Sequence, residues 1–360
     1  MRPVSSLIDI PLSLGTVSVS IVDTTFSMVN LSTSTSFGPE ITGFETSSSG
    51  AWSFLIEHTD SRLVFDLGIP VRWETDFPPR ISDQVRAITA SGANVGATQY
   101  VSDILEDAGI ALDTIDAVIW SHTHFDHIGR PSLFPSSTDL IVGEGTLEAF
   151  GYGYPDSPNS PYLARELANR TVTEIPFPSN TTRIGGLAAY EYFGDGSFYL
   201  LEAPGYEIGH INALARVTSS PPSFIHLGGD SFHHTSQLCP NRFVLLPKKI
   251  RLEQHLKSVP NPYTANLTSP RNTPFATVNQ YENGGSLARY PEIARDVISK
   301  IHAFDADERV LVVGAHDDSL RGRIDLFPKK ANHWRDKGWK KRTRWEFVAD
   351  YEEALALLKV

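Results

Sequence analysis

Apolar and polar residues alternate over short stretches along much of the chain. Residues 15–24 show this alternation, which is typical of a strand with one buried face. Residues 51–57 and 62–66 are two apolar runs separated by four polar residues. Two such runs joined by a short polar segment indicate a β-hairpin. Asp66 ends the second run, where a carboxylate can either support a site or begin a turn.

The rest of the chain mixes helical and strand patterns. Apolar residues recur at helical spacing in residues 98–109 and 293–304, so we expect a helix in each. Strands are expected where apolar runs are bounded by Gly, Pro or Ser, at residues 115–120, 140–142, 187–193, 197–203, 213–218, 223–227 and 310–313. Two β-rich halves with helices between them indicate an α/β protein.

Three stretches are rich in turn-forming residues. Residues 30–50 read as a long loop, and residues 150–180 and 235–286 as loop insertions, of which the first is expected to cover a site. We divide the chain into an N-terminal strand and loop joined to the core, a central domain, and a C-terminal extension packed on the core, at residues 1–50, 51–328 and 329–360.

Composition narrows the range of partners. The formal net charge of −11 disfavours a nucleic-acid partner, because phosphate binding needs a basic face. The single cysteine, Cys239, excludes an internal disulfide and a thiolate zinc site, so any zinc needs nitrogen and oxygen ligands. No run reaches membrane-spanning length and the N-terminus lacks a signal-peptide pattern, so we expect a cytoplasmic protein. The substrate is expected to be a small molecule. The sequence predicts no oligomeric state.

One segment concentrates metal-binding side chains. His122, His124, Asp126 and His127 fall within six positions, directly after the apolar run 115–120. At the end of a strand that turns into another element, such side chains can project in one direction. We interpret the segment as a metal site in which His122 and His124 hold one ion, while Asp126 and His127 face a second ion or hold a hydrolytic water.

Two more strand ends carry possible ligands, Asp230 after residues 223–227 and His316 after residues 310–313. The set resembles the metallo-β-lactamase superfamily, whose H-x-H-x-D-H motif, later aspartate and final histidine occur here in that order. Residues 52–58, 65–68 and 121–127 are most similar to the N-acyl homoserine lactonase branch and its fungal lactamase-like relatives. The resemblance implies a four-layered αβ/βα sandwich with the site at one edge.

The resemblance also implies a role for each ligand. His122 and His124 would bind the first ion, Asp230 would bridge, and the second ion would be bound by Asp126, His127 and His316. One position departs from the family, because its third ligand of the first ion is a histidine and this sequence has Tyr206 in Ala203-Pro204-Gly205-Tyr206.

Tyr206 leaves three arrangements open. His210 could be drawn in as a replacement ligand, Tyr206 could bind as a phenolate, or the first site could be weak and the enzyme could work with one ion. A phenol is a poor ligand unless the cation displaces its proton. We expect weakened or single-ion occupancy.

These features predict a metal-dependent hydrolase acting on a small cyclic ester or amide, with one or two zinc ions, or manganese or iron in their place. The resemblance implies that Asp126 would orient the attacking water and protonate the leaving group. His233 stands where the lactonase branch has a tyrosine that donates to the developing oxyanion, and we expect it to take that role. Aromatic side chains of the loop-rich stretches are expected to form a partly apolar pocket: Tyr152, Tyr154, Phe232 and Phe275. The alternatives are a thioesterase or nuclease of the same fold, or a non-catalytic binding protein that lost a metal ligand.

Overall fold

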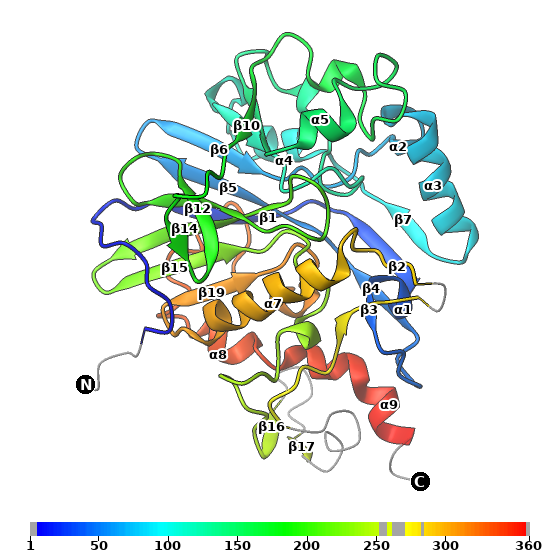
Figure 1. The fold of residues 1–360 in the computed structure, drawn as a ribbon, viewed down its shortest axis with the longest axis vertical. Helices are drawn as coiled ribbons and strands as arrows, with labels where there is room; N and C mark the ends of the chain where they lie inside the picture. Colours follow the sequence, from blue (N-terminus) through cyan, green and yellow to red (C-terminus); the bar gives the residue numbers. More distant parts are fainter. Residues whose placement is uncertain (1–5, 252–257, 261–270, 282–283, 358–360) are drawn as a thin grey trace.

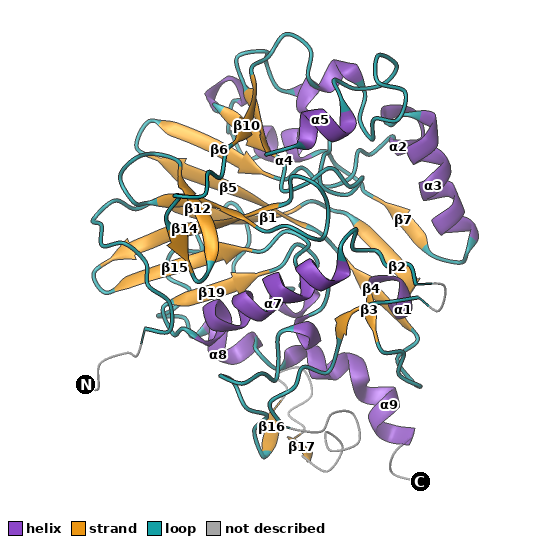
Figure 2. Ribbon diagram, in the orientation of Figure 1, coloured by secondary structure: helices purple, strands orange, loops and turns teal. Residues whose placement is uncertain are grey.

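Two six-stranded sheets face each other in the computed structural model, which describes residues 6–251, 258–260, 271–281 and 284–357 (Figures 1 and 2). The first sheet has the order β1-β5-β6-β8-β9-β10, with bounds Ser18–Asp23, Trp52–His58, Ser61–Phe65, Ala117–Ile119, Asp139–Gly143 and Val172–Ile175. The second runs β11-β12-β13-β14-β15-β19, with bounds Arg183–Ile184, Leu187–Glu191, Phe198–Glu202, Ile211–Ser219, Pro222–Leu227 and Val310–Val313.

Strand direction changes within each sheet. In the first sheet, β1, β5 and β6 pair antiparallel, whereas β6, β8, β9 and β10 pair parallel. In the second sheet all pairs are antiparallel except the last, β15 with β19. Parallel neighbours end at the same edge of a sheet, so the polar residues that follow β15 and β19 emerge side by side.

Helices cover the outer faces of both sheets (Figure 1). The helices on the side of the first sheet are α2 Trp73–Asp76, α3 Pro79–Ala90, α4 Val101–Asp107 and α5 Thr146–Phe150. Those near the second sheet are α7 Pro291–Ala306, α8 Trp339–Thr343 and α9 Glu352–Leu357. The predicted four-layered αβ/βα sandwich is therefore confirmed. None of the helices among the described residues combines the length and apolar character needed to cross a membrane.

Alternation along the strands produces three apolar layers. On β5, Phe54 and Ile56 point into the core between the sheets, whereas Leu55 points outward to α3 and α4. On β19, Leu311 and Val313 enter the same central core, and Val310 packs toward α7. Successive strand residues face opposite sides of the sheet, so each strand contributes apolar side chains to two layers.

Smaller elements complete the chain. The short strands are β2 Ser27–Ser32, β3 Phe37–Gly38, β4 Thr46–Ser49, β7 Asn94–Gly96, β16 Lys249–Arg251, β17 Ser258–Pro260 and β18 Thr277–Val278. The single-turn helices are α1 Thr33–Ser36, η1 Leu112–Thr114, η2 Pro131–Leu133, η3 Ala164–Glu166, η4 Thr235–Gln237, η6 Asp318–Leu320 and the longer η7 Glu346–Tyr351.

One sequence prediction about local structure is wrong, and one helix was not predicted. Residues 30–50 are not one loop, because β2 pairs with both β4 and β7, and β3 pairs with β18. The helix α3 was missed because only Ile81, Ser82 and Val85 of its twelve residues are buried, which leaves a narrow apolar stripe. The expected strands, the hairpin and the helices at 98–109 and 293–304 are present, with shorter bounds in several cases.

The division into 1–50, 51–328 and 329–360 stays a prediction. The first segment contributes β1 to the first sheet, where six residues pair with β5. The last segment places Trp334 and Trp339 in the core between the sheets. Parts of all three segments, including residues 252–257 and 261–270 of the predicted insertion at 235–286, lie outside the described residues.

Candidate metal centre

The histidine motif follows β8 in a loop that folds back on the first sheet. The Trp120 indole N–H donates to Ile128 O at 2.9 Å, and the Leu67 N–H donates to His127 O at 2.8 Å. Gly129 lies against Leu67 with φ +42°, and a Cβ atom there would come within 2.3 Å of the Leu67 Cβ. Only glycine fits such a close approach, so this residue holds the loop over the strand end.

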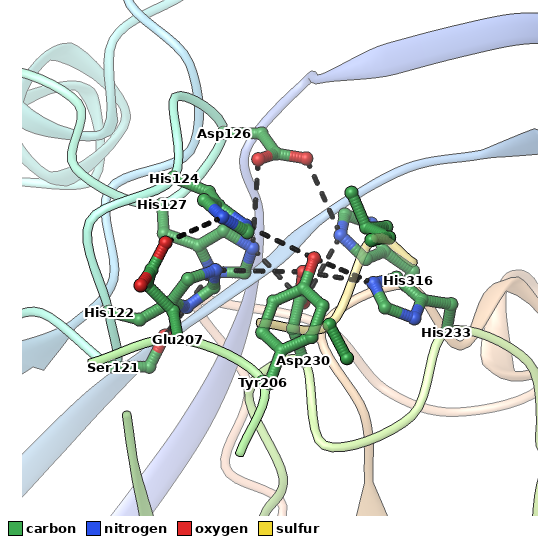
Figure 3. A network of polar contacts seen from close by, with 12 residues as sticks. Ser121, His122, His124, Asp126, His127, Tyr206, Glu207, Asp230, His233 and His316 are labelled. Atoms are coloured by element: carbon green, nitrogen blue, oxygen red, sulfur yellow. Dashed lines mark hydrogen bonds and ion pairs between the residues drawn. The ribbon is translucent and has the colours of Figure 1, made fainter. Parts of the chain in front are cut away.

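Three strand ends meet at one edge of the sandwich. Asp230 follows β15 and His316 follows β19, and these two strands are neighbours in the second sheet. The Ile211 N–H at the start of β14 donates to Ser121 O at 2.8 Å, which joins the second sheet to the histidine loop of the first. Figure 3 shows the resulting ring of imidazoles and carboxylates.

The structure forms two groups of possible ligands. The Asp126 group consists of Asp126, His127 and His316, all buried. His316 Nε2 lies 3.5 Å from Asp126 Oδ2, and His127 Nε2 lies 3.8 Å from Asp126 Oδ1. In each group, all the ligand atoms lie within 4.8 Å of one another.

The His122 group consists of His122, His124 and Asp230, and the side chain of His124 is 26% exposed. Asp230 lies between the groups, with Oδ2 at 3.7 Å from His122 Nε2 and Oδ1 at 3.1 and 3.3 Å from His127 and His316. The sequence prediction that Asp230 could bridge two ions is compatible with this position.

Three buried atoms at the centre of the ring have no hydrogen bond in the described structure: His122 Nε2, His127 Nε2 and Asp230 Oδ1. Such atoms are costly to bury unless something else satisfies them. Two of them, His127 Nε2 and Asp230 Oδ1, lie only 3.1 Å apart without hydrogen-bond geometry. A cation between these atoms would satisfy all three, so the side chains fit a metal ion.

The outward nitrogen, Nδ1, is already engaged in three of the four histidines of the ring. His127 Nδ1 donates to Asp66 Oδ2 at 2.8 Å, and His316 Nδ1 donates to Gly50 O, also at 2.8 Å. His122 Nδ1 lies 3.0 Å from Ser121 Oγ, whose hydroxyl donates to the same Asp66 carboxylate. These contacts leave Nε2 of these three rings facing inward, an arrangement typical of metal-binding histidines. The sequence left open whether Asp66 supports a site or begins a turn, and these contacts match the supporting role.

The charges in the ring call for a positive partner. Burial alone raises the pKa of Asp230, but His127, His316 and His233 outweigh burial and hold that pKa well below its usual range. Burial lowers the pKa of His316, but Asp230 and Asp126 raise it to about 9. Protons on these imidazoles balance the buried carboxylates, and a divalent cation would do the same.

Tyr206 occupies the gap in the His122 group. Its hydroxyl lies 3.1 Å from His124 Nδ1 and 2.9 Å from His233 Nε2. Burial, and then the nearby Asp230 and Asp126 carboxylates, raise the pKa of Tyr206 well above its ordinary value. The phenol is therefore neutral unless a cation displaces its proton, and it can donate a hydrogen bond inside the site.

His210 requires a correction, because the structure does not bring it into either group. Its Nδ1 donates to Ala203 O at 2.9 Å, and its Nε2 accepts the Asp230 N–H at 3.1 Å. Burial lowers its pKa to about 4, so the ring is neutral. Both nitrogens are used by backbone groups, and His210 therefore fixes the strand end that carries Asp230 rather than replacing the missing histidine.

A cavity of about 920 Å³ opens from the site. Its floor contains His124, Asp126, Tyr206, Asp230, His233 and His316. Its walls come mainly from β2, α3 and residues 35–49, 317–323 and 346–353. The pocket predicted from loop aromatics is wrong: Phe232 and Phe275 are buried in the core, and neither Tyr152 nor Tyr154 lines this cavity.

Two residues at the rim of the site were missed by sequence reasoning. Glu207 Oε2 lies 3.4 Å from His124 Nε2, and Arg289 pairs with the same carboxylate. Burial raises the pKa of Glu207, but hydrogen bonds from His124 and Arg289 bring it down to about 2. Glu207 is adjacent to Tyr206, so its place near the site could have been suspected from the sequence. Arg289 is 82 positions after Glu207, and no sequence pattern marks it.

Comparisons with known proteins agree with this geometry. A model of the metallo-β-lactamase superfamily matches residues 49–186. The chain is 39% identical to gamma-lactamase FDB1 of Fusarium pseudograminearum, over 95% of this chain and 84% of that protein. It is 37% identical to metallo-hydrolase mfmC of Annulohypoxylon moriforme, over 96% of this chain and 90% of that protein.

A solved structure shares the fold at low sequence identity. It is a quorum-quenching N-acyl homoserine lactone hydrolase, with a TM-score of 0.55 and 16% identity, over 89% of this chain and 100% of that one. The likeness supports the two-sheet architecture. The motif order, the family model and the two relatives above show that this chain belongs to the metallo-β-lactamase superfamily and is a hydrolase.

Proposed function

We propose that the protein is a metal-dependent hydrolase that opens small lactones or lactams. The observation that carries this proposal is the set of inward-facing atoms without hydrogen bonds, His122 Nε2, His127 Nε2 and Asp230 Oδ1. The name of one relative, a gamma-lactamase, supports a cyclic amide as the substrate. A small cyclic ester presents a similar carbonyl to an activated water. Zinc is the proposed ion, and manganese or iron also suits a mixed imidazole and carboxylate set.

We assign the chemistry to residues on the floor of the cavity. A bound ion would supply a Lewis acid and lower the pKa of water. Asp126, buried beside His127 and His316, orients the attacking water and takes its proton. As the ring bond to the carbonyl carbon breaks, Asp126 gives that proton to the leaving oxygen or nitrogen.

Tyr206 and His233 are proposed to receive the substrate carbonyl. His233 Nε2 lies 2.9 Å from the Tyr206 hydroxyl and 3.3 Å from Asp230 Oδ2, so two groups able to donate lie close together beside Asp230. Donors already in place at a developing oxyanion stabilise the transition state without reorganisation. The phenol is the stronger candidate of the two, because its hydroxyl faces the ring and is buried.

The charge of the cavity walls separates the alternatives. Six carboxylates line the cavity in addition to those of the ring: Glu45, Asp317, Asp318, Glu346, Asp350 and Glu353. The two arginines that line it, Arg321 and Arg323, both pair with carboxylates. A nucleic acid or another polyanionic substrate would meet repulsion here. A neutral lactone or lactam is therefore favoured over a nuclease substrate.

Metal analysis combined with a substrate panel tests the proposal. Purified protein is expected to contain zinc or a related ion and to hydrolyse neutral lactones and lactams faster than thioesters or phosphodiesters. A chelator should remove both the ion and the activity, and added zinc should restore them. Protein that turns over lactones at an unchanged rate after losing all its metal would refute the proposal.

A further inference from the structure

His124 differs from the other three histidines of the ring in how its outward nitrogen is held. His122, His127 and His316 use buried hydroxyl, carboxylate or backbone partners. His124 is partly exposed, and the group facing its Nε2 is the Glu207 carboxylate, with Oε2 at 3.4 Å. Its other nitrogen, Nδ1, faces the Tyr206 hydroxyl inside the site.

The Glu207 carboxylate is itself fixed from the opposite side. Its Oε1 accepts the Ile208 N–H at 2.7 Å and the Arg289 Nε–H, which leaves Oε2 for His124. The backbone around Arg289 is tied to the same turn, because the Arg289 N–H donates to Tyr206 O and the Tyr290 N–H donates to Gly205 O, both at 2.8 Å. The side chain of Glu207 is only 10% exposed. These contacts hold the Glu207 carboxylate in place beside the His124 imidazole.

We infer that Glu207, held by Arg289, is a positioning residue that fixes the tautomer of His124. A carboxylate at Nε2 favours the proton on that nitrogen, so the lone pair of Nδ1 points into the His122 group. A carboxylate behind a metal-binding histidine orients the ring and makes it a stronger donor. This inference rests on the proposed metal-dependent function, and it explains how a group with a tyrosine in place of a histidine can still bind an ion.

A plain surface ion pair would be the simpler explanation of Glu207 and Arg289. Arg295 and Glu292 on α7 form a plain surface pair of this kind. Glu292 is 84% exposed and is not part of the cavity. The two carboxylates therefore form a matched pair for an experiment, one facing His124 and one remote from the site.

The test measures zinc affinity in the full-length protein by competition with a chromogenic chelator. Glu207→Ala is expected to weaken binding to the His122 group by about 10- to 100-fold, the usual effect of removing an outer partner of a metal ligand. Glu207→Gln keeps the size and one acceptor, so its loss should be smaller. Arg289→Ala should fall between wild type and Glu207→Ala, and Glu292→Ala should match wild type.

A second readout follows the imidazole directly. In protein with ¹⁵N-labelled histidine, the His124 signal, assigned through His124→Gln, should show the Nε2–H tautomer in wild type and a mixture in Glu207→Ala. Affinity within twofold of wild type in Glu207→Ala and Glu207→Gln, with an unchanged tautomer, would overturn the inference while leaving the proposed function standing. Wild-type protein that binds no zinc would overturn both.

Discussion

The two ligand groups of the site differ in burial and in charge. The Asp126 group has its own carboxylate, shares Asp230, and is buried throughout. The His122 group has no carboxylate besides the shared Asp230, and a neutral phenol, Tyr206, stands where the family has a third histidine. A cation gains more from two buried carboxylates than from one, so the Asp126 group is expected to bind its ion more tightly. One site can therefore combine a strong and a weak metal position.

Removing Asp230 should erase the difference between the groups, because both depend on it. For Asp230→Ala we expect loss of bound metal from both groups and a fall in activity of more than about 100-fold, beyond the usual effect of an outer residue. Metal analysis and lactone turnover measure this. Asp350→Ala, which removes a carboxylate that is 53% exposed at the cavity wall, is the control and should keep the metal. Retention of either ion in Asp230→Ala would show that the groups are independent.

Single histidine variants should reveal the order of affinity. His316→Ala removes a ligand of the Asp126 group and is expected to abolish the tighter binding event and turnover. His124→Ala removes a ligand of the His122 group, and we expect it to abolish the weaker event together with turnover. Zinc titration resolves the two events. Turnover that survives in His124→Ala would mean that the His122 group takes no part in catalysis.

Tyr206→His restores the histidine found in the family and should reduce the difference between the groups. We expect zinc affinity of the His122 group to rise more than about tenfold, because a neutral imidazole binds without first losing a proton. Tyr206→Phe removes the hydroxyl alone and is the matched variant, for which no gain is expected. If Tyr206→His leaves affinity and stoichiometry unchanged, the phenol already serves as a full ligand.

The two groups should also differ in the number of protons that they release on binding an ion. This is the smallest of the expected effects. The pKa of His316 is raised to about 9, so this imidazole carries a proton at pH 7 that an ion must displace. Burial, with His127 and His124, lowers the pKa of His122 well below its usual value, so that ring carries none. Binding to the Asp126 group should weaken as pH falls below about 9. Calorimetry in buffers of different ionisation enthalpy should detect more protons released by the tighter event, and equal release would contradict the assignment.

Much of the fold could be read from periodicity. The strands around residues 51–66 stand out as two apolar runs with a short polar segment between them. The buried strands that end before His122, Asp230 and His316 stand out as apolar runs followed directly by Ser121, Gly228 and Gly314. Residues 30–50 could not be read in this way. Their short strands β2, β3 and β4 gain their partners from β7 and β18, and these pairings depend on contacts between distant segments.

The sequence by itself determined the candidate ligands other than His210, since their residue types and their places after apolar strands point to metal chemistry. The contacts of His210, Tyr206 and Arg289 were decided only by the tertiary structure. It turned His210 toward the backbone, placed Tyr206 between His124 and His233, and brought Arg289 to Glu207. Hydrogen-bond partners such as these are chosen by distance and direction in space, and linear order along the chain carries neither.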